Sequence, residues 1–190
     1  MFHFLVGLGN PGPRYARTRH NLGYMLVDHL ADQAGASFQP GKGDFLFCQA
    51  GGYYLVKPTT FMNLSGIAVF QLLQLFGGEP GHMLVAYDDC DIPLGTIRLR
   101  LSGSAGTHRG MESVIYHLGT EEIPRLRMGT GPRPDGADLS DFVLSDFPSV
   151  EHEAVGRMVK AAARCVEVYS GNPALAVSEC GSLASEEEES

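Results

Sequence analysis

Two positions in the sequence hold side chains that can move a proton. His20 directly precedes a run of apolar residues at helical spacing. The positive end of a helix dipole disfavours the imidazolium form, so an imidazole in this place is suited to accept a proton near neutral pH. Asp88 follows the apolar run 83–87, at the sheet edge where open α/β folds place their ligands. The two residues predict general acid–base chemistry, with a structural histidine and a solvated acidic turn as the alternatives.

Three further segments are unusual in composition. Residues 7–12 fit the G-x-G-x-x-G pattern of dinucleotide-binding loops, but Pro11 and Pro13 delay the helix that such a loop requires. Residues 57–66 read Lys-Pro-Thr-Thr-Phe-Met-Asn-Leu-Ser-Gly and offer either an apolar surface beside an amide, or a hydrophobic staple capped by Asn63. The glycine-rich residues 103–110 suit a phosphate cradle or a mobile loop. The spacing of the histidines predicts no metal site.

The elements that carry these segments alternate along the chain. Apolar runs predict strands at 2–8, 45–49, 53–57, 83–87, 96–101 and 125–129. Helical spacing predicts helices over 21–34, with Asn21 as cap, and over 63–76, 111–118 and 149–169. This order predicts a single α/β domain over residues 1–180, built as three α/β/α layers around a mixed, centrally parallel twisted sheet. Residues 181–190 predict an acidic, disordered tail.

The charge of the chain is unevenly distributed. Its 190 residues carry a formal charge of −8, which by itself argues against a nucleic-acid ligand. Residues 1–134, however, have a net charge of +1, and residues 135–190 have a net charge of −9. Residues 1–27 and 92–111 each hold three arginines and no acidic residue. An RNA substrate is therefore permitted, and the acidic part is expected to face away from it or to limit its affinity.

The four cysteines show neither a Cys-x-x-Cys motif nor a framework spacing. They predict no disulfide scaffold and no Cys-rich zinc site, and they favour a reducing compartment. No apolar run approaches the about 20 residues of a membrane span. The first nine residues lack the charged start of a signal peptide. We therefore expect a cytoplasmic protein that is not bound to a membrane.

The segments 6–12, 18–21, 57–66 and 88–95, together with Tyr15, closely resemble the bacterial peptidyl-tRNA hydrolase family in order and spacing, over residues 2–175. The resemblance implies a monomeric α/β enzyme that uses no metal and no organic cofactor. It implies hydrolysis of the ester that joins a peptide to the 3′-terminal ribose of tRNA, which recycles prematurely released peptidyl-tRNA.

The resemblance also implies a role for each matching residue. His20 is the general base that activates water, and Asp88 stabilises its proton-accepting form. Asn10 belongs to the catalytic set and separates N-blocked peptidyl-tRNA from free aminoacyl-tRNA. The remaining matches bind the 3′ end, the peptide or the acceptor-stem phosphates of the tRNA, and they are Tyr15, Phe61, Met62, Asn63, His108, Arg109, Arg100, Arg125 and Arg127.

One departure from the family pattern concerns residues 106–110. Where the family reads Gly-Gly-His-Asn-Gly, this chain has Thr107 and Arg109 in place of a glycine and the asparagine. An arginine donates hydrogen bonds but cannot accept one, so we expect activity with altered binding. Two other classes stay open: a noncatalytic RNA-binding relative like a splicing factor, and a dinucleotide-binding oxidoreductase.

Overall fold

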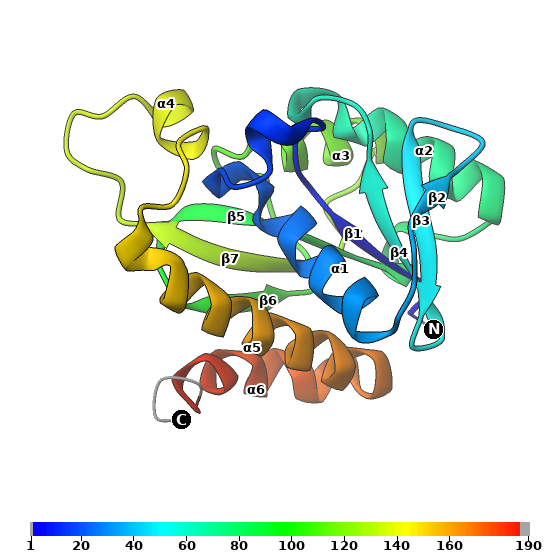
Figure 1. Ribbon diagram of the computed structural model, residues 1–190. Coiled ribbons are helices and arrows are strands. Elements are labelled where there is room, and N and C mark those ends of the chain that lie inside the picture. The colour runs from blue at the N-terminus through cyan, green and yellow to red at the C-terminus, as the bar shows by residue number, and fades with distance from the viewer. Residues whose placement is uncertain (1, 187–190) are drawn as a thin grey trace.

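A computed structural model describes residues 2–186, and Figure 1 shows a central sheet with helices on both faces. The strands are β1 (Phe4–Gly7), β2 (Gln39–Pro40), β3 (Phe45–Ala50), β4 (Tyr53–Pro58), β5 (Met83–Pro93), β6 (Ile97–Arg100) and β7 (Arg125–Gly131). The helices are α1 (Leu22–Gln33), α2 (Ser65–Phe76), α3 (Arg109–Leu118), α4 (Leu139–Val143), α5 (His152–Gly171) and α6 (Pro173–Glu186). Short 3₁₀ turns precede α1, α2 and α5 at Arg19–Asn21, Met62–Leu64 and Ser149–Glu151.

The seven strands lie in the order β2-β3-β4-β1-β5-β7-β6. The four central strands, β4, β1, β5 and β7, run parallel. The outer strands β2, β3 and β6 are antiparallel to their neighbours. The predicted mixed, centrally parallel sheet is thus confirmed. Because parallel strands end at one edge, the segments after β1, β4 and β5 meet there.

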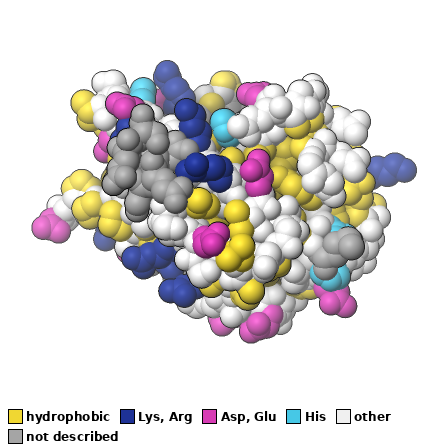
Figure 2. Space-filling model, turned by 90° about the horizontal axis from the view of Figure 1, so that it is seen from below, with side chains coloured by type: hydrophobic (Ala, Val, Ile, Leu, Met, Phe, Trp, Pro, Cys, Tyr) yellow, Lys and Arg dark blue, Asp and Glu magenta, His cyan; other side chains and the backbone are white. Residues whose placement is uncertain are grey.

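Two apolar cores lie on the two faces of the sheet. One joins the sheet to α1, α5 and α6, and the other joins it to α2 and α3, which confirms the three-layer arrangement (Figure 1). Ile97 and Leu99 of β6 belong to the first core, so Arg98 and Arg100, which alternate with them, point to the opposite face. Seen from the side of α5 and α6, charged side chains of both signs are interspersed with apolar ones (Figure 2).

At Gly23, near the start of α1, the helix backbone lies directly against the backbone of the sheet. A Cβ atom added at Gly23 would overlap the carbonyl of Ala86 and the amide of Leu8, and one added at Gly7 would overlap the carbonyl of Gly23. Only glycine permits so close an approach of helix to strand. As a result, the turn that carries His20 lies directly above the carboxyl ends of β1 and β5.

Several expected boundaries were wrong. β5 does not end at residue 87 but runs on to Pro93, because it keeps pairing with β7 across an irregularity between Asp89 and Pro93. The short helix α4 was not predicted. The chain is not irregular from residue 181, since α6 continues to Glu186. The rest of the expected tail, residues 187–190, lies outside the described residues.

The cysteines also differ from expectation. Cys165 of α5 and Cys180 of α6 form a disulfide between buried side chains, with their Cα atoms 5.2 Å apart. This bridge was not predicted, because a spacing of 15 residues matches no cysteine motif. The cysteine argument for a reducing compartment therefore fails.

Among residues 2–186, no helix combines the length and the apolar character needed to cross a bilayer.

We expect Gly23→Ala to destabilise the fold by about 1–3 kcal/mol, because the new methyl group would push α1 off the strands. Gly156→Ala is the matched control, since a Cβ at this exposed position in α5 meets open space. That control should be neutral or slightly stabilising. Urea unfolding of both variants measures the difference, and equal free energies of unfolding would contradict the close approach.

Candidate functional site

A cleft of about 730 Å³ opens at the carboxyl edge of the parallel strands. Its lining includes every site residue that the sequence predicted: Asn10, Tyr15, His20, Phe61, Met62, Asn63, Asp88, Arg100, His108, Arg109, Arg125 and Arg127. The glycine-rich segment 103–110, expected as a phosphate cradle or a mobile loop, forms part of one wall, whereas the wall segment that includes α4 was not predicted. The cleft thus brings together residues from six separate parts of the chain.

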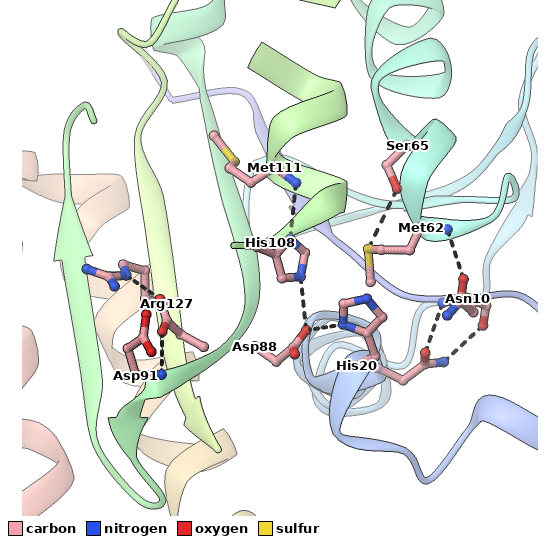
Figure 3. A network of polar contacts seen from close by, with 11 residues as sticks. Asn10, His20, Met62, Ser65, Asp88, Asp91, His108, Met111 and Arg127 are labelled. Atoms are coloured by element: carbon pink, nitrogen blue, oxygen red, sulfur yellow. Dashed lines mark hydrogen bonds and ion pairs between the residues drawn. The ribbon is translucent and has the colours of Figure 1, made fainter. Parts of the chain in front are cut away.

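The centre of the cleft is a buried carboxylate shared by two imidazoles (Figure 3). Asp88 is 2% exposed, and its Oδ1 lies 2.8 Å from Nδ1 of His20 and 3.1 Å from Nε2 of His108. The backbone N–H of Met111 donates to Nδ1 of His108 at 3.1 Å. That bond makes Nδ1 of His108 an acceptor, so its Nε2 carries the proton and donates to Asp88.

The same carboxylate fixes the orientation of His20. With Nδ1–H donating to Asp88, the lone pair on Nε2 of His20 is left free to accept a proton. Burial by itself raises the pKa of Asp88, but the neighbouring His20 and His108 outweigh that effect through charge and hydrogen bonds. The net pKa lies well below the usual range of an aspartate. Asp88 is therefore ionised wherever a histidine can act as a base.

The trio of His20, Asp88 and His108 also has the compactness of a metal site, since its three ligand atoms lie within 4.8 Å of one another. A metal ion binds the unprotonated nitrogen of an imidazole. In His108 that nitrogen is already the acceptor for the Met111 amide, and the nitrogen facing Asp88 bears the proton. The hydrogen bonds thus favour a proton-handling cluster over a metal centre.

A second network holds Asn10 in the cleft (Figure 3). The Asn21 side chain accepts from the backbone N–H of Asn10 at 2.9 Å and donates to its carbonyl at 3.0 Å. Oδ1 of Asn10 accepts from the backbone N–H of Met62 at 2.8 Å. These three bonds orient the side chain so that its Nδ2 group remains as a donor for the cleft.

The side chains of Asn21 and Asn63 do not cap the helices that follow them, contrary to expectation. Asn21 makes no side-chain bond to α1, because its amide is used by Asn10. Asn63 does not cap α2 either, since it lies in the 3₁₀ turn Met62–Leu64 with its side chain exposed. Asn21 instead holds the backbone of Asn10, and Asn63 lines the cleft.

The two neighbouring apolar side chains Phe61 and Met62, expected as an apolar surface, differ in their exposure to solvent. Phe61 is 55% exposed and meets Tyr15 edge-to-face, with ring centroids 6.4 Å apart. Met62 is only 4% exposed and packs in the core below, which corrects the expectation of an exposed pair. An exposed aromatic ring can stack on a nucleobase or on an apolar side chain.

The predicted phosphate-binding arginines have different surroundings. Arg125 is 1% exposed and donates to the carbonyls of Ile123, Ser104 and Glu121 at 2.8 to 3.0 Å. With the side chain almost fully buried and three of its five N–H donors bonded to carbonyls, Arg125 is held in the fold, which argues against the expected phosphate contact. Arg127 pairs with Asp89 at 2.6 Å and is partly exposed.

Arg100 is exposed on β6, and so is Arg98, which lies opposite Arg127 in the β6–β7 register. Like charges placed opposite each other on two strands repel, and the Asp89 carboxylate paired with Arg127 compensates part of this repulsion. Arg98 is one of the three arginines of the basic segment 92–111, but it was not predicted as a site residue. Its alternation with Ile97 and Leu99 was the available signal.

Arg109 is the exposed first residue of α3 and borders both the cleft and an adjoining hollow of about 440 Å³. Across residues 2–186 no ion pair involves it, so its charge is available to a ligand. On the opposite wall, Asp138 caps α4 by accepting from the N–H groups of Ser140 and Asp141. Part of the acidic segment therefore lines the cleft, contrary to the expectation that it faces away.

Comparisons with known proteins agree with this geometry. The family model described as "Peptidyl-tRNA hydrolase" matches residues 4–185. The chain is 44% identical to the peptidyl-tRNA hydrolase of Pseudothermotoga lettingae, over 86% of this chain and 88% of that protein. It is 48% identical to that of Synechococcus sp. strain JA-3-3Ab, over 86% and 75%. The crystal structure of the Acinetobacter baumannii peptidyl-tRNA hydrolase superimposes with a TM-score of 0.88 at 31% identity, over 95% and 94% of the two chains.

Asp88→Asn tests the shared carboxylate through its pH dependence. Because the pKa of Asp88 is lowered in the folded state, its ionisation stabilises the fold above the ordinary pKa near 3.8. This contribution is lost as the pH falls through that value toward the lowered pKa. We expect the variant to be less stable by on the order of 2–3 kcal/mol at neutral pH, and the difference to narrow between about pH 5 and about pH 2.

Urea unfolding across that pH range measures the effect, and Asp135→Asn in the exposed loop is the control. A stability difference between wild type and Asp88→Asn that stays constant with pH would contradict the lowered pKa.

Proposed function

Because the chain belongs to the peptidyl-tRNA hydrolase family and hydrolyses the ester bond of peptidyl-tRNA, we propose that His20 is the base that activates the attacking water. The observation that carries the proposal is the Asp88 oxygen that accepts from Nδ1 of His20 and leaves Nε2 free. A positioned imidazole of this kind contributes about 10²- to 10⁴-fold to a rate.

In this mechanism Nε2 of His20 takes a proton from water as the water oxygen attacks the ester carbonyl. The imidazolium that forms is stabilised by the ionised Asp88. The tetrahedral intermediate then collapses, the bond to the ribose oxygen breaks, and His20 returns the proton to that oxygen. His108 does not exchange protons in this scheme, because both of its nitrogens are engaged by Met111 and Asp88. Its part is to keep Asp88 ionised and in place.

Asn10 and the apolar side of the cleft bind the peptide end in our proposal. The Nδ2 donor of Asn10 is suited to the amide carbonyl of the N-acyl group, which an unblocked aminoacyl ester lacks. Phe61 and Tyr15 supply the platform for the terminal adenine or for a side chain. Asn63 and Arg109, at the mouth of the cleft, contact the 3′ end. With the trio and Asn10 intact, activity persists despite the substitution at residue 109.

The tRNA phosphates are expected at the β6–β7 edge, on Arg98, Arg100 and Arg127. Residues 1–180 form the catalytic domain. We propose that the enzyme works in the cytoplasm and uses no metal and no organic cofactor. In this proposal it acts as a monomer, because one chain supplies the whole cleft.

Two other functions are less favoured. A noncatalytic RNA-binding role does not require the hydrogen-bonded trio at the bottom of the cleft. A dinucleotide-binding role requires a helix to begin directly after residues 7–12, and α1 begins only at Leu22. Loss of turnover in the intact protein would favour the first alternative.

We expect His20→Ala to lower the hydrolysis of N-acetyl-aminoacyl-tRNA by about 10²- to 10⁴-fold while tRNA binding is retained. His82→Ala is the matched control, because His82 lies just before β5 at the opposite edge of the sheet. Unblocked aminoacyl-tRNA should resist cleavage by the wild type. Equal rates for His20→Ala and the wild type would show that His20 is not the base.

We expect tRNA affinity to fall with added salt, and Arg100→Ala or Arg127→Ala to reduce the log–log slope by about 1 each, since each phosphate contact releases counterions. Arg125→Met should leave the slope unchanged but lower the stability, because three carbonyls lose their donor. Filter binding over a salt series measures the slopes. An affinity that does not change with salt would show that the arginines of the β6–β7 edge do not bind the tRNA phosphates.

A further inference from the structure

One wall of the cleft, formed by α4 and Leu144, stands apart from the sheet. In Figure 1 the helix α4 lies at the end of a long loop, next to the N-terminal turns and away from the strands. Leu139, Val143 and Leu144 of this wall line the cleft. A five-residue helix has little stability of its own, so its position must come from the contacts of its ends.

The residue that makes these contacts is Arg19, the neighbour of His20. Its side chain is 6% exposed and does not line the cleft. Nη1 donates to Oγ of Ser145 at 3.0 Å and to the carbonyl of Asp146 at 2.8 Å, just after α4. Nη2 donates to the carboxylate of Glu151 at 2.7 Å, in the turn before α5. One guanidinium thus joins the end of the wall to the start of α5.

Aromatic and backbone contacts complete the attachment. The guanidinium lies over the rings of Phe142 and Phe147, 4.7 and 4.8 Å from their centroids. The backbone N–H of Arg19 donates to the carbonyl of Ser145 at 3.1 Å. The planar fork of arginine can serve three acceptors and two ring faces at once, whereas a lysine ammonium cannot.

We propose that Arg19 is a positioning residue that sets the distance between the α4 wall and the catalytic imidazole. The turn Arg19–Asn21 presents His20 to the cleft on one side and holds the wall through Arg19 on the other. The inference rests on the proposed role of His20. The wall contacts the bound substrate without touching the reacting atoms, so its displacement weakens the binding of ground state and transition state alike.

Three variants separate positioning from general stability. Arg19→Lys keeps the charge but loses the fork, and Glu151→Gln removes the ion pair while leaving the bonds to Ser145 and Asp146. Arg17→Gln is the control, because Arg17 is an exposed neighbour whose side chain makes only a surface ion pair with Asp146. We expect Arg19→Lys to raise KM for N-acetyl-aminoacyl-tRNA by about tenfold with kcat within about twofold of wild type.

Glu151→Gln should show the same pattern to a smaller degree, and Arg17→Gln should match wild type. Hydrogen exchange of residues 139–147, followed by mass spectrometry, should accelerate in the first two variants only. This readout does not depend on catalysis, so it remains informative even if His20→Ala proves fully active and the proposed function fails.

A wild-type KM in both Arg19→Lys and Glu151→Gln would overturn the proposal. A fall in kcat that follows the loss of folded protein, with KM unchanged, would overturn it as well and make Arg19 merely structural. If Arg19→Lys does not fold, Glu151→Gln decides the question by the same two measurements.

Discussion

The site depends on one oxygen atom, Oδ1 of Asp88, which receives hydrogen bonds from two imidazoles. A carboxylate this deeply buried is costly unless donors compensate it, and removing one partner leaves an uncompensated charge. The requirement draws together three segments that are distant in sequence: the turn before α1, the middle of β5 and the start of α3. The glycine contact between α1 and the strands is what lets the first of these come close enough.

Part of this arrangement follows from sequence patterns alone. A histidine before a helix and an aspartate after an apolar strand both belong at the carboxyl edge of a parallel sheet, and His20 and Asp88 meet there. The family resemblance assigned His108 to substrate binding, and its hydrogen bond to Asp88 was not predicted. The tautomer of that histidine is set by the backbone N–H of Met111, which is an interaction that no residue type encodes.

Other features were beyond the sequence for physical reasons. Residue type does not tell which side of a strand is covered, and the phosphate role that the resemblance implies for Arg125 does not reveal that its guanidinium bonds to three carbonyls. The asparagines expected as caps have amides that bond equally well to a neighbouring loop, and Asn21 does so. The helix α4 and the bridge between α5 and α6 depend on tertiary contacts, which local periodicity does not report.

Charged side chains of both signs line the cleft, with Arg100, Arg109 and Arg127 among the cations and Asp89, Asp91 and Asp138 among the anions. A polyanion such as the tRNA of the proposed function is attracted by the first set and repelled by the second. The mixture therefore limits the net electrostatic attraction of the cleft, so that the position of the phosphates relative to each carboxylate matters more for affinity than the total charge of the protein.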